Sequence, residues 1–327
     1  MKAMIVKEFG GPEQLTISEV HAPHAHIIVD AAWAGVNFVD IYQREGRYPG
    51  VQQPLTMGIE GSGIISKVDA VAEASGWHVG DRVAYTTGVQ GSYAEQVAVP
   101  VAHLVRVPQS VSLHDACAAL EQGLTAIVLS EDVARLQAGS TVLVHAAAGG
   151  VGGWMVQLLV AKGHTVIGTA SSASKATWLQ SVGAQAVRYD GDADWVADVL
   201  RLTQDRGVDV VFDSVGKATF TNSLKAVATK GHVVLFGAAS GQPEPVDVLQ
   251  LMRKSITLTR PVLPHYLDTP AALQAHAEKV FHYLQDGKVQ LRVHQQYPLA
   301  DASLAHIALA ERGTQGKLLL AINTALD

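Results

Sequence analysis

The chain has 327 residues, of which 48% are apolar, and this is enough for packed cores and excludes global disorder. Its 24 basic and 30 acidic side chains give a formal net charge of -6, and without a basic stripe we expect no nucleic-acid and no membrane partner. The single cysteine, Cys117, excludes an internal disulfide framework and, with no signal-peptide pattern, indicates a cytoplasmic protein of about two domains.

The first hundred or so residues predict short strands separated by turns. Apolar or alternating runs occur at 4–6, 27–31, 63–68, 82–85, 93–99 and 104–107. Glycine-containing turn signals such as Gly80-Asp81 separate them. Because no helical period of good length competes with these runs, we expect a compact, barrel-like, β-rich domain.

A strict alternation of strands and helices follows a helical stretch at 116–130. We expect strands at 141–146, 165–169, 186–189, 208–212 and 232–236, with helices that begin at Val151, surround Trp178 and span 195–202 and 220–227. The run at 141–146 is apolar throughout, as in a parallel strand that is buried on both faces. Repeated βα units with short loops predict a doubly wound parallel sheet of the Rossmann type.

The alternation weakens after Pro261. Helices are expected at 271–285 and 303–311, and a last strand at 318–322. We therefore expect residues 1–118 and 262–327 to form one domain, with the doubly wound domain at 119–261 inserted into it. Within 249–261 a helix precedes an apolar edge strand at 255–259, and such an edge is protected when it pairs with its copy, which predicts a homodimer.

A glycine-rich turn links the strand at 141–146 to the next helix. Ala147, Gly149 and Gly152 have the G-x-G-x-x-G spacing, with Gly150 and Val151 between the last two. Small residues at these places allow a tight turn, a close approach of the backbone to a pyrophosphate, and close packing of helix on strand. The free N–H groups at the helix N-terminus favour phosphate, so the pattern predicts a dinucleotide site. The alternative is a glycine turn that binds nothing.

The stretch after the second strand indicates which dinucleotide binds. An NAD site normally has an Asp or Glu about twenty residues past the glycines. This chain has no acidic residue between Asp132 and Asp190, and it has Ser171, Ser172 and Lys175 at that place. Hydroxyls and a cation favour the 2′-phosphate, so we predict NADPH. The alternative for Lys175 is a solvated lysine on a helix.

With these residues in hand, the chain resembles the medium-chain dehydrogenase/reductase superfamily, and within it the zinc-free quinone oxidoreductase branch. The stretches that carry the resemblance include GVNFVDIYQREGRYP at 35–49, AAAGGVG at 146–152, DSVG at 213–216 and TQGK at 314–317. The resemblance covers nearly the whole chain. It implies a GroES-like β-rich catalytic domain that encloses a Rossmann domain.

The metal positions of zinc-dependent relatives have lost their ligands in this sequence. The segment aligned with the first ligand has Asn37, and the Gly-His-Glu element has Ile59 in place of its histidine. We therefore expect no metal, and we expect Glu60 to be a structural carboxylate that is paired or hydrogen-bonded. The histidines at 21, 24 and 26 are expected in an exposed loop, with a metal site as the alternative.

The resemblance also implies roles for individual side chains. Asn37 and Tyr48 would line the nicotinamide and substrate pocket and donate hydrogen bonds to the substrate, with a loop cap as the alternative for Asn37. The remaining residues expected to bind the cofactor are Gln122 and Thr125 on the helix at 116–130, Lys175 and Tyr189 near the adenosine 2′-phosphate and ribose, Ser214, Phe236 and Gly237 at strand ends, and Arg312 as a second cation. Plain core packing is the alternative for Phe236.

The predicted activity is transfer of a hydride from NADPH to quinones without a metal. A simple alcohol or ketone needs a Lewis acid at its oxygen, whereas a quinone spreads the incoming charge over its own ring. Two alternatives stay open at this point. One is an NADPH-dependent reductase of α,β-unsaturated carbonyls or enoyl thioesters, and the other is an NADPH-binding protein with little turnover.

Overall fold

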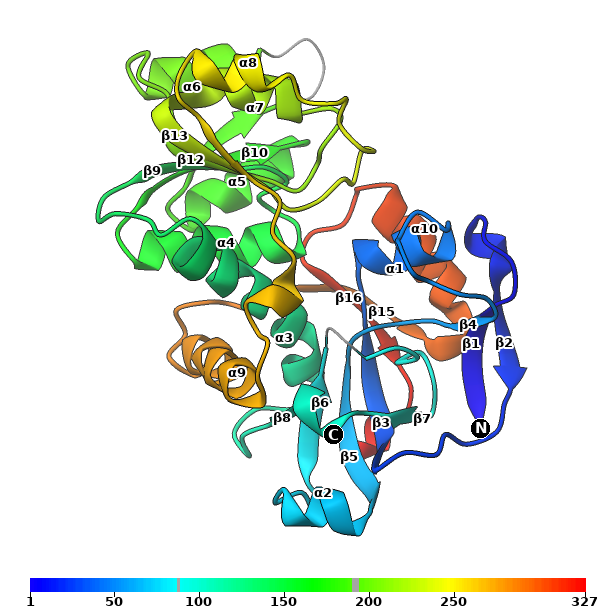
Figure 1. The fold of residues 1–327 in the computed structure, drawn as a ribbon. Helices are drawn as coiled ribbons and strands as arrows, with labels where there is room; N and C mark the ends of the chain where they lie inside the picture. Colours follow the sequence, from blue (N-terminus) through cyan, green and yellow to red (C-terminus); the bar gives the residue numbers. More distant parts are fainter. Residues whose placement is uncertain (87–88, 190–193) are drawn as a thin grey trace. The chain divides into compact units, whose positions relative to one another are not determined.

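The computed structural model of the protein describes residues 1–86, 89–189 and 194–327. Contacts between residues divide the chain into two compact units (Figure 1). Unit 1 contains Met1–Leu124, Leu267–Gly287 and Leu291–Asp327, and unit 2 contains Thr125–Tyr266 and Lys288–Gln290. Unit 1 is thus formed by segments before and after unit 2 in the sequence. The domain limits of 118/119 and 261/262 remain a prediction.

Unit 1 is built on two β-sheets. Within the described residues, the larger sheet has seven strands in the order β15-β16-β3-β5-β6-β8, with β7 paired to β3. These strands are β3 (Ile27–Val36), β5 (Gly61–Val68), β6 (Arg82–Tyr85), β7 (Gln96–Ala98), β8 (Leu104–Arg106), β15 (Val293–Pro298) and β16 (Lys317–Ala321). The smaller sheet joins β2 (Leu15–Glu19), β1 (Lys2–Val6) and β4 (Leu55–Thr56). Because β16 pairs antiparallel with β3, the late and early segments of the chain share one sheet.

The helices of unit 1 are α1 (Phe38–Arg44), α2 (Ala70–Ala74), α9 (Pro270–Gln285), α10 (Ala302–Ala310) and α3 (Leu113–Ile127), whose last three residues belong to unit 2. Two of these helices, α1 and α2, lie in the first hundred residues, where the sequence indicated no helical period of good length. Both α1 and α2 are too short to produce a helical period, and local caps define them instead. The Asp69 carboxylate accepts hydrogen bonds from the N–H groups of Val71 and Ala72, which begins α2.

Unit 2 contains a six-stranded, wholly parallel sheet in the described part of the chain, with strand order β11-β10-β9-β12-β13-β14. Its strands are β9 (Thr141–Val144), β10 (Thr165–Ala170), β11 (Gln185–Arg188), β12 (Val208–Asp213), β13 (Val227–Leu235) and β14 (Thr257–Thr259). The helices are α4 (Gly150–Ala161), α5 (Ala173–Ser181), α6 (Trp195–Leu202), α7 (Phe220–Ala226) and α8 (Val248–Met252). The predicted doubly wound sheet is therefore confirmed. From β9 the next strands in the sequence, β10 and β11, are added on one side, and β12, β13 and β14 on the other. Such sheets bind ligands at this switch point between β9 and β12.

Three strands were missing from the sequence expectations. In β15 one residue of six is buried, and in β2 one of five, so neither segment has the apolar alternation that identifies a strand. The third, β4, has two residues and is set by its pairing with β1. All three exist because a neighbouring strand supplies hydrogen bonds, which the local sequence does not encode.

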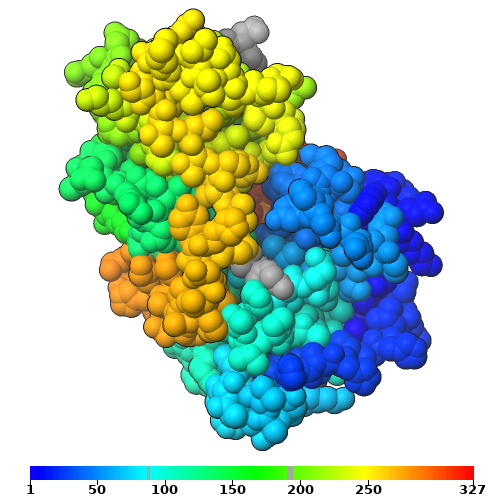
Figure 2. Space-filling model, viewed as in Figure 1, coloured from blue at the N-terminus to red at the C-terminus, as the bar shows by residue number. Residues whose placement is uncertain are grey.

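Two further features concern the surface. None of the helices found in the described ranges has the length and apolar character needed to cross a membrane. On α8, the side chains of Val248, Leu249 and Met252 are all more than 60% exposed. The segment around them is coloured yellow and covers part of the visible surface in Figure 2. It precedes the edge strand β14, which is shorter than the predicted strand at 255–259 because Ser255 has a left-handed backbone with a φ of 51°.

Candidate active site

The predicted glycine turn lies at the carboxyl end of β9. Gly149 is the N-cap of α4, and Gly150, Val151 and Gly152 are its first residues, whose N–H groups have no carbonyl partner one turn back in the helix. A Cβ atom on Gly152 would lie 2.4 Å from the Ala146 carbonyl oxygen and 2.9 Å from the Cα of Ala147, so only glycine fits there. The turn therefore brings bare backbone and free donors together, and it fits the pyrophosphate of a dinucleotide.

A second group of predicted residues lies at the neighbouring carboxyl ends of β10 and β11. Ser172 is the N-cap of α5 and accepts a hydrogen bond from the Lys175 backbone N–H at 3.3 Å. The Lys175 Nζ lies 3.4 Å from the Ser171 Oγ, and the Tyr189 N–H donates to the Ala170 carbonyl at 3.3 Å. Lys175 is only 9% exposed, and burial lowers the pKa of its ammonium group. The alternative of a solvated helix lysine is therefore wrong.

The ends of β12 and β13 hold the remaining predicted residues of unit 2. A Cβ on Gly237 would lie 2.4 Å from the Ser214 carbonyl oxygen, so the two segments touch through their backbones. Phe236 is half-buried, and its N–H donates to the Asp213 carbonyl at 2.9 Å. The Asp213 carboxylate accepts from the N–H groups of Val215 and Gly216 and shapes this loop, a role that sequence reasoning missed although the DSVG motif contains it.

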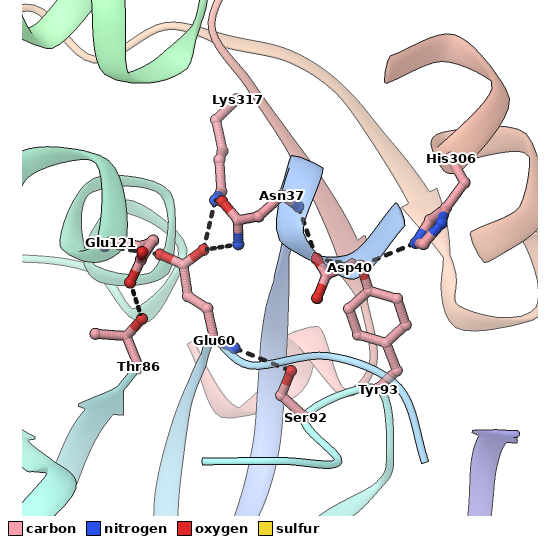
Figure 3. A network of polar contacts seen from close by, with 9 residues as sticks. All are labelled: Asn37, Asp40, Glu60, Thr86, Ser92, Tyr93, Glu121, His306 and Lys317. Atoms are coloured by element: carbon pink, nitrogen blue, oxygen red, sulfur yellow. Dashed lines mark hydrogen bonds and ion pairs between the residues drawn. The ribbon is translucent and has the colours of Figure 1, made fainter. Parts of the chain in front are cut away.

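In unit 1, the ends of three adjacent strands bring Asn37, Glu60 and Lys317 together (Figure 3). Asn37 follows β3, Glu60 precedes β5, and Lys317 opens β16, and β3 lies between the other two strands. Lys317 and Glu60 form an ion pair whose side chains are both 0% exposed. The Lys317 Nζ also donates to the Asn37 Oδ1 at 2.8 Å, and the Asn37 Nδ2 donates to the Glu60 Oε2 at 2.9 Å. The expected pairing of Glu60 is confirmed.

Two carboxyl groups of this network have unusual pKa values. Burial raises the pKa of Asp40 from 3.8 to about 7, although its Oδ2 accepts from the Asn37 N–H at 2.7 Å and from the Tyr93 hydroxyl at 3.0 Å. Burial and the nearby Glu60 charge raise the pKa of Glu121, which accepts from the Thr86 hydroxyl, from 4.5 to about 7. Both carboxyl groups can therefore exchange a proton near neutral pH.

The buried histidine His306 extends the network beyond Asp40 and Tyr93. The His306 Nε2 lies 3.3 Å from the Tyr93 hydroxyl, and its Nδ1 lies 3.1 Å from the Arg44 Nη1. Burial and the Arg44 charge lower the pKa of His306 from 6.5 to about 3, so the ring is neutral. Because the guanidinium can only donate, Nδ1 accepts and Nε2 carries the hydrogen. His306 thus donates to Tyr93, and Tyr93 donates to Asp40.

Four predicted site residues, described next, have no contact given above with the clusters of unit 1 and unit 2. Tyr48 lies in the loop after α1, is 42% exposed, and has no hydrogen bond from its hydroxyl to any described residue. Arg312 is exposed and follows α10 with a φ of 59°. On α3, Gln122 is 7% exposed and Thr125 is half-buried. Their contacts with a cofactor stay predictions. Asn37 is the N-cap of α1, as the cap alternative requires, and its carboxamide also bonds to Lys317 and Glu60.

The candidate metal residues are not assembled into a site. Across the described ranges, no three His, Cys, Asp or Glu side chains gather where they could hold a metal ion. His26 pairs instead with Asp69, with 2.5 Å between Nδ1 and Oδ2. Cys117 is buried, and burial raises the pKa of its thiol well above its usual range. Ile59, at the place of the usual histidine ligand, is 8% exposed.

Sequence reasoning missed most of the buried network of unit 1. The side chains that it did not single out are Asp40, Thr86, Ser92, Tyr93, Glu121, His306 and Lys317. For Lys317 a signal existed, because it ends the TQGK motif and opens an otherwise apolar strand. A charged residue at a buried strand position requires a partner of opposite charge.

Comparison with known proteins agrees with this architecture. The chain matches the family model of the alcohol dehydrogenase GroES-like domain over residues 23–109 and that of zinc-binding dehydrogenases over residues 150–278. It is 38% identical to a quinone oxidoreductase of Pseudomonas aeruginosa, over 95% of this chain and 97% of the relative. It is 31% identical to a 2-haloacrylate reductase of a Burkholderia species, over 97% and 98% of the two chains.

A solved structure extends the comparison to three dimensions. The quinone oxidoreductase of Escherichia coli complexed with NADPH superposes with a TM-score of 0.93 at 33% identity, over 98% of this chain and 100% of that one. Fold and sequence therefore agree over almost the full length. The chain belongs to the quinone oxidoreductase branch of the medium-chain dehydrogenase/reductase superfamily.

Proposed function

We propose that this protein is an NADPH-dependent quinone oxidoreductase that works without a metal. The observation that carries the proposal is the glycine turn at the start of α4, next to the corner formed by Ser171 and Lys175, in a chain that matches quinone oxidoreductases from end to end. The relative from Escherichia coli binds NADPH with the same fold.

In unit 2, the chain's own atoms would hold the cofactor by its phosphates. The N–H groups of residues 150–152 would donate to the pyrophosphate, because they point out of the helix N-terminus. Lys175 and Ser171 would bind the 2′-phosphate, with Tyr189 beside them at the ribose. When bound, NADPH supplies the hydride. Ser214, Phe236 and Gly237 lie at neighbouring strand ends of the same sheet and would contact the rest of the cofactor.

Unit 1 would supply hydrogen bonds to the electron acceptor. As a quinone accepts hydride, negative charge develops on its oxygen, and a donor placed there lowers the barrier. The Asn37 carboxamide and the Tyr48 hydroxyl are the candidate donors. Gln122, Thr125 and Arg312 are proposed as further contacts to the cofactor. Ile59 replaces a metal-ligating histidine, so no Lewis acid is expected to take over this task. The proton that completes the hydroquinone would come from water or from Tyr48.

We further propose a homodimer and a cytoplasmic location. The exposed apolar residues of α8 and the short edge strand β14 would be covered by the same segments of a second copy. The single, buried cysteine is consistent with a reducing compartment.

The test is a parallel assay of purified protein with NADPH and four acceptor classes: an ortho-quinone, a para-quinone, an enoyl thioester and a simple ketone. We expect fast turnover of the quinones, activity that survives chelation, and NADPH preferred over NADH. Turnover confined to the enoyl thioester would favour a reductase of α,β-unsaturated carbonyls. Tight NADPH binding with no turnover of any acceptor would favour a binding protein, and efficient ketone reduction would refute the proposal.

A further inference from the structure

The Asn37 carboxamide is held in one orientation by its two charged neighbours. Its Oδ1 accepts from the Lys317 ammonium at 2.8 Å, and its Nδ2 donates to the Glu60 carboxylate at 2.9 Å. A carboxamide turned by 180° would set its N–H groups against an ammonium that can only donate, and its oxygen against a carboxylate that can only accept. The ion pair therefore fixes the orientation of the Asn37 carboxamide, with Oδ1 toward Lys317 and Nδ2 toward Glu60.

Glu60 is itself fixed from several sides. Its Oε1 accepts from the Glu121 backbone N–H at 2.9 Å, and its own N–H donates to the Ser92 hydroxyl at 3.1 Å. Gly35 of β3 makes room for the ion pair because it has no side chain. A Cβ at this position would lie 2.0 Å from the Glu60 Oε2 and 2.9 Å from the Lys317 Cε. The Lys317 backbone is fixed on the other side, where its N–H donates to the Arg292 carbonyl at 2.8 Å and β16 pairs with β15. The pair thus forms a rigid support for Asn37.

One polar hydrogen of this support remains available. The Asn37 Nδ2 carries two hydrogens, and Glu60 takes one of them, while no hydrogen bond to a described residue takes the other. Asn37 is partly buried but retains some exposed surface, whereas the Lys317 and Glu60 side chains are 0% exposed. The cation on the Asn37 oxygen polarises the amide and strengthens its N–H groups as donors. The remaining N–H is therefore oriented and polarised, and it belongs to the one residue of the three that has exposed surface.

We propose that Lys317 and Glu60 are positioning residues that aim this N–H of Asn37 at the oxygen of the electron acceptor. They do not touch the acceptor, and they act only through Asn37. The inference rests on the proposed function, because the oxygen that accepts the hydrogen bond belongs to the quinone.

The test is a cycle of variants around Asn37. Glu60→Gln is nearly isosteric, and its amide oxygen must face the Glu121 N–H, which puts an N–H₂ group toward Lys317 and Asn37. Glu60→Gln/Lys317→Met replaces the buried ion pair by a neutral pair, so that no unpaired charge stays in the core. Each is made in the wild type and in an Asn37→Ala background, with Lys67→Met on the exposed face of β5 as the matched control.

The rate constant kcat is measured with a para-quinone at saturating NADPH, and the Kd of NADPH by fluorescence titration. We expect Glu60→Gln and the double variant to lower kcat by roughly 10- to 100-fold, the loss of one charge-assisted hydrogen bond in the transition state, while the Kd changes less than about twofold. In the Asn37→Ala background the same substitutions should lower kcat no further. A purely structural role would instead multiply the losses and change the Kd.

Two results would overturn the inference: a double variant whose kcat equals that of Lys67→Met, or a further loss of kcat in the Asn37→Ala background. If the double variant does not fold, Glu60→Gln alone gives the same comparison, since it keeps the size of the side chain. Failure of the proposed function is seen separately, because a wild-type protein that does not reduce quinones refutes the function before any variant is compared.

Discussion

The buried carboxyl group of Asp40 should make the stability of unit 1 depend on pH. Burial raises its pKa from 3.8 to about 7, so between these values the folded protein keeps a proton that the unfolded chain releases. The free energy of unfolding must then fall as the pH rises through that window. Asp40→Asn removes this titration and keeps an oxygen that accepts from the Asn37 N–H and from the Tyr93 hydroxyl.

The size of the effect follows from the pKa values. Holding the ionised carboxylate in the folded state above pH 7 costs about 4 kcal/mol, at about 1.4 kcal/mol per pH unit. At pH 5 the cost is only roughly 2 kcal/mol, because this pH lies little more than one unit above the unfolded pKa of 3.8. From pH 5 to pH 8 the wild type should therefore lose roughly 2–3 kcal/mol more stability than Asp40→Asn.

The Asp40 Oδ1 has no hydrogen-bond partner among the described atoms, so an introduced amide N–H₂ at that place would be buried without an acceptor. This lowers the stability of the variant by about 1–3 kcal/mol, but equally at every pH. The quantity to compare is thus the slope and not the level. Titrations of Glu121 and His306 are present in both proteins and cancel.

Urea unfolding at four pH values between 5 and 8 measures this slope, with tryptophan fluorescence as the signal. Asp268→Asn, at an exposed position, is the matched control and should run parallel to the wild type. Parallel curves for Asp40→Asn and the wild type would refute the reasoning, because they would mean that Asp40 titrates alike in the folded and unfolded chain.

Further predictions concern the cofactor site, the sheet and the dimer. Lys175→Ala should raise the KM for NADPH about tenfold or more and that for NADH less than twofold in steady-state assays, and an equal change for both would refute its place at the 2′-phosphate. Gly152→Ala should weaken NADPH binding in a fluorescence titration, because its Cβ would lie 2.4 Å from a backbone oxygen, and an unchanged Kd would contradict this. Gly35→Ala should lower the Tm, since its Cβ would displace the Glu60 carboxylate, and a Tm equal to that of the wild type would count against the rigid ion pair. Met252→Asp should halve the mass seen by light scattering, and a monomeric wild type would remove the dimer proposal.

The sequence predicted what depends on local pattern. Strand β9 and the turn after it were identified because apolar runs and glycine spacing are written in neighbouring residues. Strand β15 was not, because its faces are largely exposed and its pairing with β16 defines it.

For the candidate site, too, only the residues that belong to a local sequence pattern or a family motif could be predicted. The residues around the glycine turn were found by spacing, and Asn37 by resemblance. Lys317 was not found as a site residue, because its significance depends on Glu60, which lies 257 positions away in the chain. Burial and pairing of charges over that separation become visible only when the strands are assembled.

The pairing of β16 with β3 has a consequence for how the chain is synthesised. On the ribosome, β3 and Glu60 emerge early, while Lys317 and the strand that covers β3 emerge only after the whole of unit 2. Until then the nascent chain carries a Glu60 carboxylate without its cation and a β3 edge without its neighbour. Unit 2 is contiguous apart from Lys288–Gln290 and can begin to fold during this interval. Completion of unit 1 therefore follows the synthesis of unit 2, and nascent chains stalled before residue 317 should depend on chaperones that shield unpaired strand edges.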